Sequence, residues 1–195
     1  VLTDKELKKV IDYVETQRHA ERNRTMLLLT HYCGMRVGEV ATLQFADVVD
    51  EQGTVLDEIV LDAERTKSKR ARRIFLPKHM QRQLQQFVER QATAKAATAY
   101  LFSTQKQVRF TANTAAQHLQ RLYAQAAISG ATSHSGRRTW LTESSSKGVG
   151  VRAKAEMAGH ASIQTTQRYI DVNDEQMRST AAVSYTHLTL PTIYS

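Results

Sequence analysis

The sequence contains few of the residues that mark secreted, membrane-embedded or multidomain proteins. Its single cysteine, Cys33, cannot form a disulfide within the chain, and its apolar neighbours favour a core position in a reducing compartment over a nucleophile. The longest apolar run, around Met26 to Thr30, is far too short to span a bilayer, and the N-terminus has no signal pattern. Only two prolines occur, with no evident linker or repeat. We therefore expect one cytoplasmic domain.

Length and charge narrow the class of protein. A chain of 195 residues with 41% hydrophobic composition can bury an ordinary soluble core. Its 27 Lys and Arg outnumber its 19 Asp and Glu, which gives a net charge of +8. Such an excess is typical of proteins that bind a polyphosphate, although many basic proteins bind nothing specific. Charge alone leaves both interpretations open.

Hydrophobic periodicity predicts a mainly helical α+β fold. A capping box, Thr3-Asp4-Lys5-Glu6, starts a helix almost at the first residue, and apolar residues follow it at helical spacing. Between Gly53 and Pro77 the segments "EIVLDA" and "RRIFL" are short and β-branched, which predicts a small antiparallel sheet. Further helices are expected at about 22–32, 37–43, 78–97, 111–127, 136–148, 151–158 and 162–169.

The two ends of the chain differ from the rest. The abrupt helix cap without a leader indicates a chain cut from something longer. After Val183 the pattern gives way to "SYTHLTLPTIYS", which is uncharged and rich in threonine. We interpret 1–183 as the domain and 184–195 as a non-native or disordered tail, such as a cloning or sequencing scar; a native arm or short strand is the alternative.

Five side chains offer the chemistry for attack on a phosphodiester. Such attack without a metal requires positive charge for the phosphate, a nucleophile, and a proton for the departing oxygen. Arginine stays charged and its planar fork binds two phosphate oxygens at once, while histidine exchanges protons near neutral pH. The sequence supplies two guanidiniums, two imidazoles and one phenol: Arg36, His134, Arg137, His160 and Tyr169.

Taken singly, each of these residues has an ordinary structural explanation. Arg36 could form an ion pair with Glu39, one helical turn on. His160 follows a glycine and could cap a helix, and Tyr169 could pack in the core. An isolated H-x-x-R, as in His134 and Arg137, is common by chance in basic proteins. Their significance depends on the sequence around them.

Three segments resemble the sequence boxes of the tyrosine recombinase (phage integrase) family, over nearly the whole chain from Leu2 to about Val183. They read "LLLTHYCGMRVGEVATLQFADV", "SHSGRRTWLTESSSKGV" and "MAGHASIQTTQRYIDV". The resemblance implies the helical catalytic domain of that family, which cuts and rejoins double-stranded DNA through a 3′-phosphotyrosyl intermediate. It implies a tetramer on two DNA sites, and no metal, nucleotide cofactor, membrane or small-molecule substrate. It is improbable that five separate structural roles would place these residues in the order of this family by chance.

The resemblance also assigns roles by matching position. Arg36 and Arg137 would hold the scissile phosphate, His134 and His160 would hydrogen-bond it and assist proton movement, and Tyr169 would attack. Glu39 would orient Arg36. The family places a general-acid lysine on a β-hairpin, for which "ERTKSKRARRIFLP" is the counterpart, and we assign Lys67 with Lys69 as the runner-up. A solvated basic turn is the alternative. Contacts to backbone phosphates are predicted for Lys69, Arg70, Arg72, Arg73 and Arg138.

Two departures from the family pattern stand out. Gly136 occupies a place where many members have a bulkier residue, and glycine costs a helix about 1 kcal/mol. Members usually also carry an N-terminal core-binding domain, which we expect to be absent from this chain, so weak and strongly salt-dependent DNA binding is expected. Two other functions fit the same residues: DNA relaxation like that of a type IB topoisomerase, and a non-catalytic DNA-binding accessory module.

Overall fold

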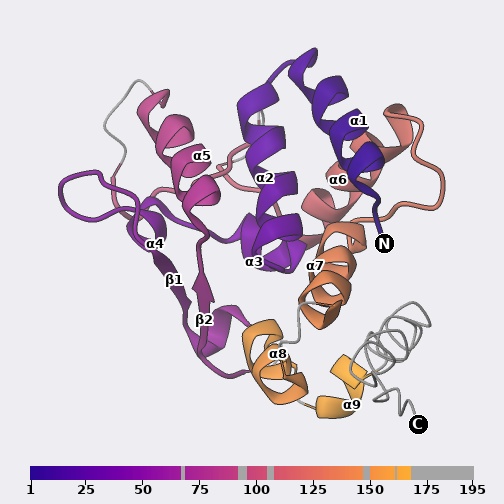
Figure 1. Cartoon of the computed structure of the whole chain (residues 1–195). Coiled ribbons are helices and arrows are strands. Elements are labelled where there is room, and N and C mark those ends of the chain that lie inside the picture. The colour runs from indigo at the N-terminus through magenta and orange to yellow at the C-terminus, as the bar shows by residue number, and fades with distance from the viewer. Residues whose placement is uncertain (67–68, 92–95, 105–107, 147–149, 161, 168–195) are drawn as a thin grey trace, which may run out of the picture.

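The computed structural model describes residues 1–66, 69–91, 96–104, 108–146, 150–160 and 162–167. In chain order its elements are α1 (Asp4–Glu15), α2 (Ala20–Tyr32), α3 (Val37–Ala41), α4 (Phe45–Val48), β1 (Glu58–Leu61), the 3-10 helix η1 (Ala63–Arg65), β2 (Arg72–Phe75), α5 (Lys78–Glu89), α6 (Ala112–Gln125), α7 (Ser135–Ser146), α8 (Val151–Ala158) and α9 (Ile163–Gln167), as labelled in Figure 1. This confirms the predicted fold class, mainly helical with a small antiparallel sheet.

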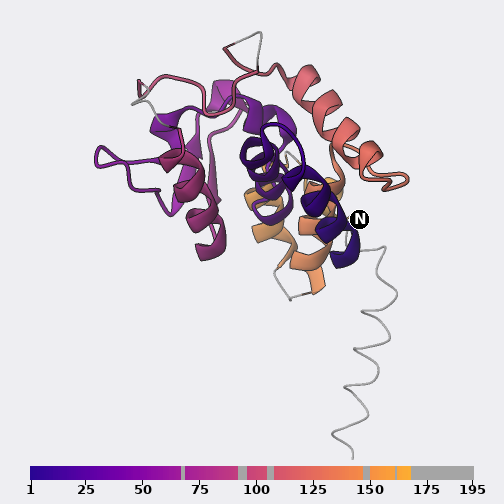
Figure 2. The ribbon, with the colours of Figure 1, turned by 90° about the horizontal axis from the view of Figure 1, so that it is seen from above.

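Helix α2 forms the centre of the helical body. It packs against α1, α3, α5 and α7, and Figure 2 shows α5 on one side of it and α6 on the other. Its residues from Thr25 to His31 are all buried, as expected of a helix that is enclosed on every side. Helices α1 and α5 each bury one apolar face, so the core of the protein lies around α2.

The first helix begins where the sequence predicts. The Thr3 hydroxyl accepts a hydrogen bond from the backbone N–H of Glu6, and the Glu6 carboxylate accepts one from the backbone N–H of Thr3, which satisfies two amide groups at the helix start. The backbone N–H of Leu2 donates to the hydroxyl of Thr139, 2.7 Å away, on α7. The N-terminal turn is thereby fixed to the helix that carries Arg137.

A glycine allows α2 and α7 to approach closely. A side chain at Gly136 would place its first carbon 2.5 Å from the hydroxyl of Thr30 and 3.1 Å from the backbone nitrogen of His31. A real atom cannot occupy that position, so the helix-propensity cost of Gly136 is accepted in exchange for contact between the two helices. The contact fixes the start of α7 beside the turn that follows α2.

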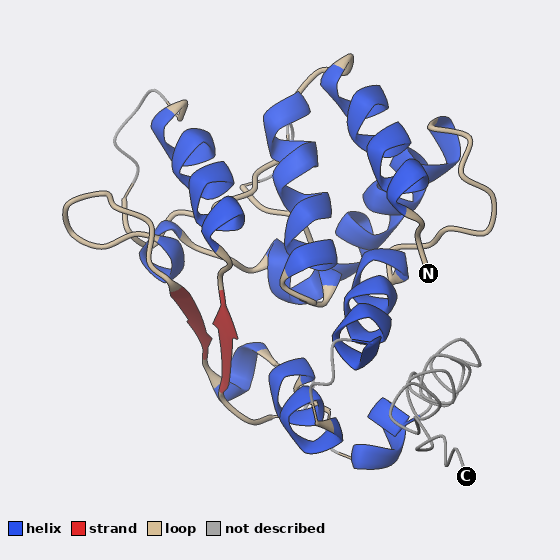
Figure 3. Ribbon diagram, viewed as in Figure 1, coloured by secondary structure: helices blue, strands red, loops and turns tan. Residues whose placement is uncertain are grey.

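The sheet extends from the helical body toward α8. Strands β1 and β2 pair antiparallel, with Ile59 opposite Ile74 and Leu61 opposite Arg72, and Figure 3 shows them reaching from the helical body to the neighbourhood of α8. Burial alternates along β2: Arg72 and Ile74 are buried, whereas the residues that follow each of them are exposed. The alternation directs one arginine of the basic hairpin into the protein.

The structure also differs from the predicted elements in detail. Helix α5 ends at Glu89, earlier than the predicted residue 97, and α4 and η1 were not predicted. These two are too short for a periodic signal and depend on a tertiary contact, in which the guanidinium of Arg65 binds both carboxylate oxygens of Asp47 at 2.8 and 2.6 Å. Across the described part of the chain, no helix is long and apolar enough to cross a membrane.

Candidate active site

The structure brings together three of the predicted catalytic residues. Arg36 immediately precedes α3, Arg137 lies in α7, and His160 follows α8. Arg36 donates to the carbonyl oxygen of Gly159 at 2.8 Å, and Arg137 donates to that of Ala158 at 2.6 Å. Because their acceptors are consecutive residues, the two guanidiniums converge on one point at the end of α8.

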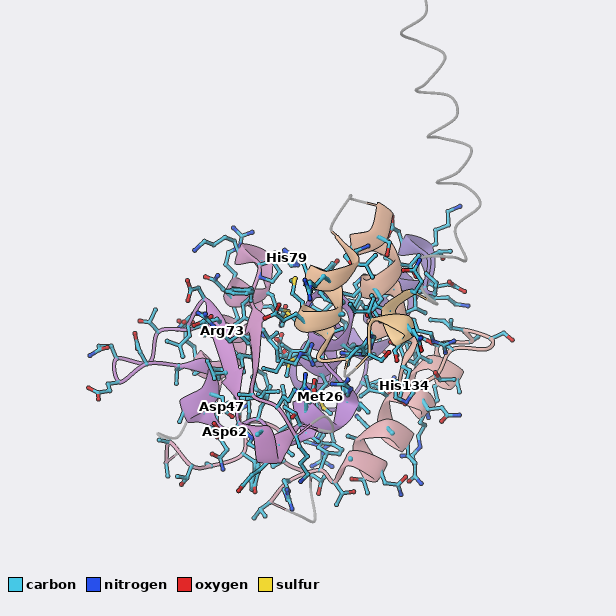
Figure 4. The ribbon with its side chains drawn as sticks, turned by 90° about the horizontal axis from the view of Figure 1, so that it is seen from below. Met26, Asp47, Asp62, Arg73, His79 and His134 are labelled. Atoms are coloured by element: carbon cyan, nitrogen blue, oxygen red, sulfur yellow. The ribbon has the colours of Figure 1, made fainter. Side chains whose placement is uncertain are left out.

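Two other predicted catalytic residues, Lys67 and Tyr169, lie outside the described residues. His134 is described, is exposed, and immediately precedes α7, where its carbonyl accepts from the backbone N–H of Arg138. Figure 4 shows His134 beside the helices and Arg73 beside the strands, well apart in that view.

The end of α8 is a favourable place for cations. The last carbonyl groups of a helix have no N–H partner within the helix, so their partial negative charge is available to cations. The chain leaves α8 at Gly159 with φ of 63°, a left-handed conformation that favours glycine. A side chain there would also come within 2.9 Å of the Arg72 side chain and 3.3 Å of a guanidinium nitrogen of Arg36. Glycine is therefore needed both for the turn and for room beside the arginines.

His160 is held through both ring nitrogens. Its Nε2 lies 3.1 Å from Nη2 of Arg137, and its Nδ1 lies 2.8 Å from the hydroxyl of Thr166 in α9. Burial lowers the pKa of the imidazole to about 4, and the positive charges of the neighbouring arginines act in the same direction. The ring is therefore neutral near pH 7.

Glu39 connects two of the arginines. Its Oε1 accepts from the Arg36 guanidinium at 2.9 Å and its Oε2 accepts from the Arg36 backbone at 2.8 Å. The same Oε2 lies 2.5 Å from Nη1 of Arg72. Glu39 is 3% exposed. Burial raises the pKa of its carboxyl, but the charges and hydrogen bonds of the two arginines outweigh burial and the net shift is downward.

Arg72 lies in a different place from the one the sequence predicts. Instead of a contact to DNA phosphates, the structure shows a buried residue, 4% exposed as a whole, whose side chain is bound to protein groups. Its guanidinium donates to Glu39, to the Met157 carbonyl at 2.8 Å and to the Gly34 carbonyl at 3.3 Å. Alternate residues of a strand point to the same face, and Arg72 shares the buried face of β2 with Ile74. The spacing of two between Arg72 and Ile74 was a signal in the sequence that could have shown that Arg72 is buried.

Gly34 joins Arg72 to Arg137. Its carbonyl also accepts a hydrogen bond from Nη1 of Arg137, a side chain that is 6% exposed. The guanidiniums of Arg36 and Arg72 thus share the carboxylate of Glu39, and those of Arg72 and Arg137 share the carbonyl of Gly34. The cluster is cationic and rigidly connected, which suits it to bind an anion.

The other residues predicted to contact DNA are less buried than Arg72. Lys69 and Arg70, which precede β2, are exposed. Arg73 pairs with both carboxylate oxygens of Glu58 at 2.8 and 2.7 Å, and Arg138 donates to the hydroxyl of Thr132 at 3.1 Å. Contacts of these four to DNA remain predictions.

A hollow of about 360 Å³ opens beside His160. Its lining includes Arg70 from the hairpin together with Arg152 and Glu156 from α8. The sequence analysis did not select Arg152, and the hollow is also lined by Ile163, which is 49% exposed. An exposed isoleucine beside basic residues departs from the core role that its type suggested.

Comparison with known proteins identifies relatives over most of the chain. The model of the phage integrase family matches residues 1–176. Tyrosine recombinase XerA of Pyrococcus furiosus is 25% identical over 177 residues, which are 91% of this chain and 59% of the relative. XerA of Thermococcus kodakarensis is 27% identical over 181 residues, with 91% and 60% covered. The chain thus spans about 60% of the length of these curated relatives.

Solved structures share the fold. A crystal structure of XerA recombinase superposes with a TM-score of 0.76 at 25% identity and covers 97% of this chain and 65% of the other. The catalytic domain of bacteriophage HP1 integrase has a TM-score of 0.60 at 18% identity, with 98% of each chain covered. XerH recombinase bound to a palindromic difH substrate has a TM-score of 0.69 at 21% identity, with 94% and 53% covered.

Proposed function

The chain belongs to the phage integrase family, and from this premise we propose that it cuts and rejoins double-stranded DNA at specific sites through a covalent bond to Tyr169. The observation that carries the proposal is the convergence of Arg36 and Arg137 at the end of α8, beside His160. Relatives named tyrosine recombinases cover 91% of the chain, which supports the same activity.

The guanidiniums of Arg36 and Arg137 suit a scissile phosphate. A guanidinium carries five N–H donors in a planar fork, so arginines held by backbone carbonyls can still donate to phosphate oxygens. In the reaction the phosphate gains negative charge, and cations fixed in advance stabilise that charge without reorganising. Arg36 and Arg137 would serve as these cations, with Glu39 and Arg72 holding Arg36 in place beneath them.

The proposed chemistry needs no cofactor. The Tyr169 phenol gives its proton to His134 or His160 and its oxygen attacks phosphorus. The bond from phosphorus to the 5′ oxygen breaks, and that oxygen takes a proton from Lys67, with Lys69 as the second candidate. The phosphotyrosine keeps the ester bond until another 5′-hydroxyl attacks it, which restores the phenol and completes a new strand. His134 and His160 would assist proton movement and contact the phosphate.

Assembly and binding follow the same proposal. We infer that Lys69, Arg70, Arg73 and Arg138 contact backbone phosphates, which position a protein on DNA without reading sequence. Strand exchange needs four cleaved strands, so we propose a tetramer on two DNA sites. The activity would take place in the cytoplasm.

A pool of nicked duplexes with randomised bases around the nick tests the proposal without knowledge of the target site. When cleavage occurs near the nick, the short released fragment diffuses away and the protein stays attached to DNA. We expect an adduct on a denaturing gel, and none with Tyr169→Phe, which should still bind DNA at low salt. Relaxation of plasmids without strand exchange would instead indicate a topoisomerase, and binding without an adduct would indicate an accessory module.

A further inference from the structure

Thr166 forms a buried contact with His160. It lies in α9, its side chain is 1% exposed, and its hydroxyl is 2.8 Å from Nδ1 of the imidazole. A buried hydroxyl needs a hydrogen-bond partner, and this one has the imidazole. Along the chain, Thr166 precedes Tyr169 by three residues.

The contacts at the two ring nitrogens together indicate which of them carries hydrogen. Nε2 of His160 lies 3.1 Å from a guanidinium nitrogen of Arg137, and arginine can only donate. Nε2 must therefore accept with its lone pair. A neutral imidazole has one hydrogen on its two nitrogens, so that hydrogen is on Nδ1 and is donated to the Thr166 hydroxyl.

We propose that Thr166 is a positioning residue for the reaction, which holds His160 with its hydrogen on Nδ1 and directs the Nε2 lone pair toward Arg137 and the phosphate site. The effect of this positioning on catalysis rests on the proposed function, whereas the position of the hydrogen does not. With Nε2 unprotonated, His160 receives a proton during the reaction, and only afterwards can it donate from Nε2 to a phosphate oxygen. Among the described residues, the guanidiniums of Arg137, Arg36 and Arg72 act on the charge of the ring, and Arg70, Arg152 and Glu156 line the hollow beside it.

The chain offers a matched pair of variants. Thr166→Ser keeps the hydroxyl and removes a methyl group. Thr166→Val keeps the branched shape of the buried side chain and removes the hydroxyl. Effects shared by both variants report packing, and effects of Thr166→Val alone report the hydrogen bond.

Nitrogen-15 NMR of the histidine rings in the full 195-residue chain tests the proposal directly, and it does so in the free protein whether or not that protein cleaves DNA. His160→Gln identifies the signal. We expect hydrogen on Nδ1 of His160 in the wild type and in Thr166→Ser, and a shift toward the Nε2-protonated form in Thr166→Val. Hydrogen on Nε2 in the wild type overturns the proposal, and that measurement stands even when Thr166→Val does not fold.

Cleavage kinetics then separate positioning from a structural role. In single turnover on nicked duplexes, Thr166→Val should lower the cleavage rate about tenfold or more. General acid–base catalysis accelerates a reaction by about 10²–10⁴-fold, and a misplaced imidazole loses part of that acceleration. DNA affinity should stay unchanged and Thr166→Ser should restore the rate. In a His160→Gln background Thr166→Val should add no further loss. A loss of equal size in both backgrounds would show that Thr166 acts by holding α9 and would overturn the proposal.

Discussion

Glu39 and Arg72 form a buried ion pair, with the carboxylate 2.5 Å from the guanidinium and the two side chains 3% and 2% exposed. Arg72 comes from β2 and Glu39 from α3, so the pair joins the sheet to the helical body beneath the proposed phosphate site. Removing one partner from a buried pair leaves the other charge without compensation.

Glu39→Gln should therefore destabilise the protein strongly. We expect the free energy of unfolding to fall by about 3–5 kcal/mol, because the amide keeps the shape of the side chain but not the charge that balances Arg72. Urea denaturation measures the change. Glu58→Gln is the matched control, since its partner Arg73 is exposed to solvent and an ion pair at the surface contributes little to stability. Equal effects of the two substitutions would contradict the buried role of Glu39.

Buried histidines should make the protein sensitive to mild acid. Burial is the main cause that lowers the pKa values of His31, His118 and His160 from 6.5 to about 4 in the folded protein. The unfolded chain therefore binds more protons between those values, so stability should be full above pH 6.5 and fall as the pH drops toward 4. Denaturation at pH 7, 6 and 5 measures this. His118→Gln should flatten the dependence, and an unchanged slope would show that this histidine is not held neutral.

Gly159→Ala should disturb the site more than a comparable substitution elsewhere. Gly159 and Gly130 both have positive φ, 63° and 70°, so alanine strains the backbone at each by about 1–2 kcal/mol. Only at Gly159 does the added carbon meet other atoms, 2.9 Å from the Arg72 side chain. We expect Gly159→Ala to lower DNA cleavage well beyond Gly130→Ala, measured on nicked duplexes. Similar cleavage by both variants would show that the arginines move aside without cost.

Arg152→Ala should weaken DNA binding in a salt-dependent way. Arg152 lines the hollow beside His160, where a DNA backbone leaving the site would meet it. Loss of one phosphate contact should reduce the slope of log affinity against log salt by about 0.9, with the cleavage rate at saturating DNA unchanged. Fluorescence anisotropy at several salt concentrations measures the slope. A slope equal to that of the wild type would place Arg152 away from the DNA.

Local signals in the sequence predicted much of the fold. The capping box placed the start of α1, and the bounds 151–158 coincide with those of α8, because caps and glycines act on their own neighbours. Helix α4 escaped prediction because it has four residues and depends on the contact between Asp47 and Arg65, which are 18 positions apart. A contact of that kind leaves no periodic pattern.

The sequence predicted which residues belong to the candidate site, but not the hydrogen bonds that connect them. The family resemblance selected Arg36, Arg137 and His160, which the structure places together, whereas spacing alone could not show that they converge on the end of α8. Arg72 was grouped with the residues that contact DNA because it follows a basic turn, whereas the alternation along β2 turns its side chain into the protein. The Thr166 contact was missed because a threonine in a polar helix carries no distinguishing signal.

The central claim is that Tyr169 becomes covalently bound to DNA, and peptide mapping of the adduct tests it most directly. After nuclease and trypsin digestion, the peptide that begins with Tyr169 and ends at Arg178 contains no other tyrosine. We predict that mass spectrometry finds a phosphonucleotide on this peptide in protein recovered from nicked duplexes. A nucleotide attached to any other residue, or cleaved DNA with an unmodified Tyr169 peptide throughout the time course, would contradict the account.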